Sequence, residues 1–196
     1  MKKSKLYNVR SSRSILSTPD DSNLFFDVVS HDVRLSAGNN ESVEFLTIEY
    51  KFFASSIACL DDSNRILLLK MPRFAIRNNP GDEYIWEMPG GRNVEFESPE
   101  DCAKRELLEE TGISTFECLP ILKDYFYPEC SFGTEKLFLF YTRHFKKIQS
   151  PIPETAGIYE HRWFHVDEAI EMIYNGHVRS SWTIIGLLGV KHLLNL

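Results

Sequence analysis

The spacing of apolar residues predicts strands through the first half of the chain. Residues 24–29 and 43–53 are rich in β-branched and aromatic side chains, and a polar turn at 36–40 separates them. Two more apolar runs, 56–60 and 65–70, flank the sequence Asp-Asp-Ser-Asn. That arrangement predicts a β-hairpin with a four-residue loop.

The second half of the chain mixes strands with helices. A helix is predicted over 99–111, because Ser98 is a good N-cap, Pro99 suits the first helical position and Gly112 fits a left-handed C-terminal cap. The other predicted elements are strands at 84–87, 115–126, 135–143 and 159–164, a mobile loop at 146–158, a helix capped by Asp167 that runs to 174, and a last helix at 182–194. Without a steady βαβ alternation, this order favours a mixed sheet flanked by helices.

Composition and charge narrow the class of protein. The chain has 196 residues, 43% of them hydrophobic, which is enough for a core and excludes global disorder. A net charge of −6 argues against nucleic-acid binding, and no apolar run is long enough to cross a membrane. The four cysteines form no CxxC pair, so we expect reduced thiols in a cytoplasmic protein. The basic, serine-containing start slightly resembles a transit peptide, but a tail or a first edge strand is favoured.

The predicted helix at 99–111 concentrates carboxylates on one side. Glu106, Glu109 and Glu110 are spaced so that they share a helix face. Like charges at this spacing repel, and no lysine lies four residues after Glu106 or Glu109 to relieve them. A divalent cation would do so, and carboxylate oxygens suit Mg²⁺ together with substrate phosphate.

The wider spacing around this helix is far more specific than the acidic face alone. Gly91 is followed after five residues by Glu97, and after seven more by the run from Arg105 to Ile113. Every position of the pattern G-x5-E-x7-R-E-U-x-E-E-x-G-U is filled, where U is a bulky aliphatic residue. This segment resembles the Nudix box of the Nudix hydrolases, which cleave nucleoside diphosphates linked to another moiety. The resemblance implies an α/β/α sandwich with a mixed β-sheet, preceded here by N-terminal strands.

The same resemblance implies a metal site. It assigns Mg²⁺ or Mn²⁺ to Glu106 and Glu110, with Glu109 assisting and the carbonyl of Gly90 completing the shell. Arg105 would orient the carboxylates through charge-assisted hydrogen bonds. Metal-bound water would attack the pyrophosphate, and a carboxylate would take the proton.

Segments outside the box resemble the ADP-ribose pyrophosphatase branch. Residues 86–91 are similar to its E-x-P-A-G segment, with Gly90 in place of alanine. Residues 70–74 stand where that branch has a Q-Y-R segment. Residues 127–136 resemble its S-P-G-x-S-x-E stretch. The substrate-binding residues implied are Arg73, Glu87, Glu97 and Glu135. In this branch the base commonly comes from a mobile loop, and the matching loop here, 146–161, offers Glu154 and Glu160. Glu154 is favoured because Glu160 is expected to begin a strand.

The resemblance also suggests a domain division. Residues 1–23 would be the tail or edge strand, 24–54 an N-terminal β-strand region and candidate dimerisation subdomain, and 55–196 the Nudix hydrolase domain. Members of this branch are usually homodimers, although the N-terminal strands are also compatible with a private sheet in a monomer.

The sequence therefore predicts Mg²⁺-dependent hydrolysis of ADP-ribose or a related nucleoside diphosphate sugar to a nucleoside monophosphate and a sugar phosphate. The partner expected is a small nucleotide, with neither nucleic acid nor membrane. Two alternatives stay open. One is a Nudix hydrolase acting on nucleoside triphosphates or GDP-sugars, and the other is a non-catalytic nucleotide-sensing Nudix domain.

Overall fold

The computed structural model describes residues 7–16, 26–35, 42–76, 78, 84–148 and 157–196, and it divides the chain into two units. The first unit comprises Met1–Phe52 together with Tyr127–Glu135, and the second comprises Phe53–Phe126 and Lys136–Leu196. The polar turn expected at 36–40 lies outside the described residues. So does most of the loop expected at 146–158.

The N-terminal unit is built on one antiparallel sheet. Its strands are β1 (Tyr7–Leu16), β2 (Phe26–Leu35) and β3 (Ser42–Tyr50), in that order, with β1 at an edge. Residues 127–135 join this unit, because Ile48 N–H donates to Phe132 O at 2.7 Å and Tyr50 N–H donates to Thr134 Oγ1 at 2.9 Å. The sequence had placed that segment in the domain expected at 55–196.

The second unit carries the remaining strands. They are β4 (Phe53–Cys59), β5 (Arg65–Pro72), β6 (Tyr84–Glu87), β7 (Gly90–Arg92), β8 (Ile113–Thr115), β9 (Leu119–Pro120), β10 (Lys136–Thr142), β11 (Phe145–Lys147) and β12 (Glu160–His165). They form a sheet of order β7-β4-β10-β9, a sheet of order β12-β5-β6 and the pair β11-β8. The pairing of β10 with β4 is parallel and the other pairings are antiparallel, so the arrangement is mixed as expected.

The hairpin predicted from 56–60 and 65–70 forms only at its turn. Leu60 and Ile66 make one bridge, and Asp61 N–H donates to Arg65 O at 2.9 Å. Beyond that bridge, β4 and β5 enter different sheets. The reason is that both backbone edges of each strand are already paired, those of β4 with β7 and β10 and those of β5 with β6 and β12.

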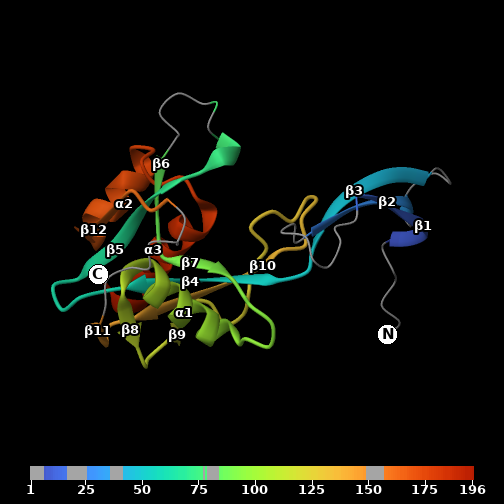
Figure 1. Cartoon of the computed structure of the whole chain (residues 1–196). Helices are drawn as coiled ribbons and strands as arrows, with labels where there is room; N and C mark the ends of the chain where they lie inside the picture. The colour runs from blue at the N-terminus through green and yellow to red at the C-terminus, as the bar shows by residue number, and fades with distance from the viewer. Residues whose placement is uncertain (1–6, 17–25, 36–41, 77, 79–83, 149–156) are drawn as a thin grey trace. The chain divides into compact units, whose positions relative to one another are not determined.

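Helices cover both sides of these strands. They are α1 (Pro99–Thr111), α2 (Val166–Tyr174) and α3 (Ser181–Leu194), and a 3₁₀ turn lies at Phe74–Ile76. Alternate residues of β4 enter separate cores: Ile57 packs in the cluster that contains Leu107 of α1, and Ala58 in the cluster that contains Leu187 of α3. Figure 1 shows α1 on one side of β4 and α3 on the other. The second unit is therefore the α/β/α sandwich expected.

Three local expectations were wrong. The run predicted as a strand at 43–53 is interrupted, since β3 ends at Tyr50 and β4 begins at Phe53, where the two units meet in sequence. The strand predicted at 115–126 reduces to the short β8 and β9. Asp167 does not cap α2, because β12 runs directly into the helix and His165 occupies the cap position without a side-chain hydrogen bond. Asp167 instead pairs with Lys191 Nζ at 2.5 Å.

No helix in the described part of the chain is both long and apolar enough to span a bilayer.

Candidate active site

Helix α1 begins and ends where its sequence predicts. Ser98 Oγ accepts the Asp101 N–H at 3.1 Å, which satisfies one of the free amide groups of the first turn. At the other end Gly112 has φ of 72°, the left-handed conformation that glycine adopts without strain, and its N–H returns to Leu108 O. These caps hold the carboxylates of the last two turns in place.

Arg105 ties the acidic face together. Its guanidinium donates to Glu97 Oε1 at 2.9 Å, to Glu106 Oε1 at 2.8 Å and to Glu109 Oε2 at 3.0 Å. Another of its nitrogens donates to Arg92 O at 2.8 Å. The repulsion expected among the carboxylates is thus partly relieved by this cation. Although burial would raise the pKa of Glu97, the hydrogen bonds from Arg105 and from the Val94 N–H lower it.

Two glycines let strand β7 approach this helix closely. A Cβ on Gly91 would lie 2.5 Å from Glu106 Oε1, and a Cβ on Gly90 would lie 2.6 Å from Ser55 O on the adjacent strand β4. Neither glycine has a positive φ. Space, rather than backbone conformation, therefore requires glycine at both positions.

Glu110 is the most buried carboxylate on the acidic face, with 7% of its surface exposed. Its Oε2 accepts the Gly90 N–H at 2.9 Å. Burial raises the pKa of Glu110 to about 8, although the hydrogen bond from Gly90 opposes that shift. Burial also raises the pKa of Glu106, with Arg105 acting against it. Both groups therefore hold protons more readily than an exposed glutamate and would release them on meeting a cation.

A buried ion pair lies beside this cluster. Glu87, at the end of β6, is 1% exposed, and Arg73 Nε donates to its Oε2 at 2.9 Å while Arg73 Nη2 contacts the same oxygen. The Arg73 guanidinium also stands 5.7 Å from the ring centroid of Trp182 on α3. Burial raises the pKa of Glu87 and Arg73 opposes the rise. Arg73 is thus held between Glu87 and Trp182, and about 39% of its side chain is still exposed to solvent.

The donor set fits a hard divalent cation. Carboxylates are the ligands that Mg²⁺ and Mn²⁺ prefer, and Glu106, Glu109 and Glu110 present them within two helical turns. Among the described residues, however, no three acidic, imidazole or thiolate groups already form a cluster able to hold a metal. In this arrangement Arg105 and the Gly90 N–H each bond to one oxygen of these carboxylates.

Three further predicted residues remain, namely Glu160, Glu135 and Glu154. Glu160 begins β12, as expected, and pairs with Arg162 Nη2 at 2.5 Å. Glu135 belongs to the N-terminal unit, and burial raises its pKa. Glu154 lies outside the described residues.

Two contacts at the site were not anticipated from the sequence. His161 Nε2 lies 2.7 Å from Glu110 O, which links β12 to the last turn of α1, and Trp182 backs Arg73. His161 stands opposite Leu69 in the β12–β5 pairing, on an element whose position no local pattern reveals. Neither residue belongs to a local motif, so only the tertiary arrangement identifies them.

Comparison with known proteins gives consistent findings. A family model described as the NUDIX domain matches residues 51–181. The chain is 30% identical over 173 residues to a CMP-5'-(N-acetyl-N-hydroxy-3-aminopropyl)phosphonate hydrolase of Streptomyces rubellomurinus (strain ATCC 31215). The matched region covers 86% of this chain and 77% of that protein. Among solved structures, the crystal structure of an ADP compounds hydrolase is similar at a TM-score of 0.79 and 15% identity, over 96% of this chain and 94% of that one.

Proposed function

This chain belongs to the Nudix family, and from that premise we propose that it is a Mg²⁺-dependent pyrophosphohydrolase acting on ADP-ribose or a related nucleoside diphosphate sugar. Nudix proteins are hydrolases of small nucleotide substrates and generally use divalent metal ions. The choice of Mg²⁺ and of the sugar-linked diphosphate is our proposal. Its products would be a nucleoside monophosphate and a sugar phosphate.

The observation that carries this proposal is the organisation of the acidic face around Arg105. Glu106, Glu109 and Glu110 would hold the cation, with the carbonyl of Gly90 as a further ligand. A bound divalent ion would neutralise phosphate oxygens and lower the pKa of a coordinated water. Arg105 holds Glu106 and Glu109 on one side of the helix before metal arrives, and the carboxylates would close around the ion on binding.

The ion pair supports binding of a diphosphate. Glu87 holds Arg73 through Nε and Nη2, which leaves Nη1 of the guanidinium to meet an anionic oxygen. The charge of Arg73 acts to lower the pKa of Glu110, which supports assigning the two groups to one site. We propose that Arg73 orients the phosphate next to the metal-bound one, while Glu97 acts through Arg105. The proton of the attacking water would go to Glu154 or Glu160.

Product analysis tests this function. The purified chain would be incubated with Mg²⁺ or Mn²⁺ and ADP-ribose, nucleoside diphosphate sugars, GDP-sugars, nucleoside triphosphates and a CMP-linked phosphonate. The last compound is included because of the relative at 30% identity. We expect AMP and ribose phosphate from ADP-ribose, lost in Glu110→Gln. Turnover confined to triphosphates or to the CMP-linked compound would refute the proposed substrate, and no turnover of any compound would favour a sensing role.

We also propose that the chain is a homodimer through its N-terminal unit. Val9, Val33, Val43 and Phe45 share one face of the three-stranded sheet by its register. Phe45 is 40% exposed and Val43 45%, and a largely apolar cavity of about 350 Å³ lies on this face. An exposed apolar sheet face of this kind favours association with a second copy.

Light scattering coupled to gel filtration tests the dimer. Phe45→Asp should shift the mass toward the monomer, because it places a charge on the proposed interface. Leu46→Asp is the matched control, since Leu46 is also exposed but lies on the opposite face of β3. A monomeric wild type, or equal effects of the two substitutions, would contradict this interface.

A further inference from the structure

A cavity of about 610 Å³ lies in the second unit, and no residue of α1 lines it. Its lining comes from the β4–β5 turn, from β8 and the residue after it, and from β11 and the residues before it. The lining residues are Asp62, Ser114, Thr115, Phe116, Arg143, His144, Phe145 and Lys146. None of them is a carboxylate of α1 or a member of the Arg73–Glu87 pair. The volume is in the range of small-molecule sites.

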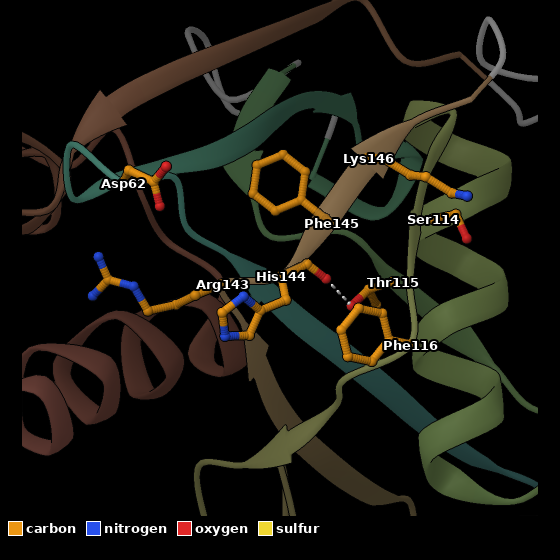
Figure 2. Close-up of a pocket in the computed structure, with 8 residues that line it drawn as sticks. All are labelled: Asp62, Ser114, Thr115, Phe116, Arg143, His144, Phe145 and Lys146. Atoms are coloured by element: carbon orange, nitrogen blue, oxygen red, sulfur yellow. Dashed lines mark hydrogen bonds between the residues drawn. The ribbon is translucent and has the colours of Figure 1, made fainter.

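An exposed aromatic pair forms one side of this cavity. Phe116 is 85% exposed, so nearly all of its ring surface faces water. It is stacked on His144, with ring centroids 6.3 Å apart and planes 13° apart. Figure 2 shows these two rings side by side, with Arg143 and Lys146 to either side of them. A flat ring placed on Phe116 would remove that apolar surface from water.

The backbone around the pair is held firmly. Thr115 Oγ1 donates to His144 O at 2.6 Å, and the same oxygen accepts the Glu117 N–H at 3.1 Å. These bonds connect the segment that carries Phe116 to the segment that carries His144. The neighbouring Phe145 ring stacks on Trp163 at 5.6 Å between centroids. A ligand would therefore meet a site that is already ordered, which lowers the entropy cost of binding.

The charges of the lining favour an anion. Arg143 Nη2 donates to Asn64 Oδ1 at 2.8 Å, which fixes the guanidinium at the wall. Lys146 is exposed and has no ion-pair partner among the described residues. The acidic groups nearby are Asp62, and Glu117 at 3.7 Å from His144 Nε2. Two permanent cations thus line the cavity with a single carboxylate.

We propose that this cavity is a second ligand site, which takes a small molecule with a planar aromatic ring and an anionic group, the class to which nucleoside monophosphates belong. The ring stacks on Phe116, and the anionic group is bound by Lys146 or by the free guanidinium nitrogens of Arg143. Because the site shares no residue with the acidic face, the inference is independent of the proposed function.

Calorimetric titration of the full chain in EDTA tests this site, with AMP as the probe. Adenosine and ribose 5-phosphate each carry half of the proposed ligand and should bind more weakly than AMP. Phe116→Ala should weaken AMP binding at least fivefold, the lower end of what loss of one stacked base costs. Lys146→Ala should weaken it severalfold and make the remaining affinity less sensitive to salt.

Matched variants separate this site from the acidic face and from general surface effects. Tyr174→Ala removes an aromatic ring that is 75% exposed elsewhere in the same unit, and Lys147→Ala removes the charge next to Lys146. Both should bind AMP like the wild type, and a site that persists in Arg73→Ala is distinct from the acidic face. The proposal is overturned if the wild type does not bind AMP, or if Phe116→Ala binds AMP as tightly as the wild type. It is also overturned if Arg73→Ala rather than Phe116→Ala abolishes AMP binding, or if ribose 5-phosphate binds as well as AMP.

Discussion

The adjacent glycines of β7 should respond to the same substitution in opposite ways. In Gly91→Ala the new Cβ meets the far end of a flexible side chain, at 2.5 Å from Glu106 Oε1. In Gly90→Ala it meets the backbone of β4, at 2.6 Å from Ser55 O and 2.8 Å from Ser56 Cα. The first clash can be relieved by turning one carboxylate, and the second only by separating two paired strands.

The distances set the expected magnitudes. Ordinary contact begins at 3.4 Å, so Glu106 Oε1 must move about 0.9 Å in Gly91→Ala. A displacement of about 1 Å in a catalytic group can cost about 100-fold in rate, whereas turning a side chain costs little stability. Gly90→Ala should lose about 1–3 kcal/mol by overpacking, which for a chain of this size lowers Tm by about 2–12 °C.

Thermal unfolding by circular dichroism and turnover in Mg²⁺ measure the two effects on the same samples. We expect Gly91→Ala to melt within about 2 °C of wild type with strongly reduced turnover. The reasoning is refuted if Gly91→Ala retains wild-type activity, or if Gly90→Ala melts with the wild type. Glu106→Gln, which removes the charge of this carboxylate without adding a Cβ at position 91, is the control for loss of its function.

Three further outcomes are expected. Metal-free protein should lose stability as pH rises from about 4.5 to 8, because folded Glu110 binds its proton with a pKa of about 8, and melting curves should show that Glu110→Gln removes part of this slope. Arg105→Lys should lower turnover about 10- to 100-fold, because an ammonium has only three N–H donors and no planar fork, whereas Arg105 bonds Glu97, Glu106, Glu109 and the Arg92 carbonyl. Lys104→Arg on the same helix should be neutral. Arg73→Ala should cost about 1–3 kcal/mol by leaving Glu87 unpaired, and adding Glu87→Gln should restore the Tm but not the KM.

Each of these has a result that would contradict it. Equal pH slopes in wild type and Glu110→Gln would show that Glu110 is ionised throughout the range. Full activity in Arg105→Lys would show that the carboxylates need no shared cation. Recovery of KM in the double variant would show that Arg73 serves the fold and does not contact substrate.

The site was predictable to the extent that its parts lie close in sequence. Helix α1 with its two caps and its acidic face follows from residues 98–112, and the structure confirms both caps. The link from Arg105 to Glu109 is also local, since it spans one helical turn. The roles of Glu154 and Glu135 stay predictions, because they depend on parts of the chain beyond this helix.

The failed hairpin prediction concerns the pairing of distant segments. The apolar pattern of 56–60 and 65–70 predicted two strands correctly but assigned them to one hairpin. Apolar alternation indicates which face of a strand is buried. It does not indicate which strands pair with its two edges, because those backbone hydrogen bonds depend on the packing of the whole unit. For the same reason, nothing in 127–135 shows that it bonds to β3.

The sequence by itself determined the family, the α1 helix and the carboxylates on its face, because capping and i to i+4 contacts depend only on neighbouring residues. Tertiary structure alone decided that Gly90 meets Glu110, that Trp182 supports Arg73, and that Phe116 and His144 form one wall of a second cavity. Those contacts join residues 20 to 109 positions apart. They exist because two hydrophobic cores, on opposite faces of the same strands, bring distant segments together.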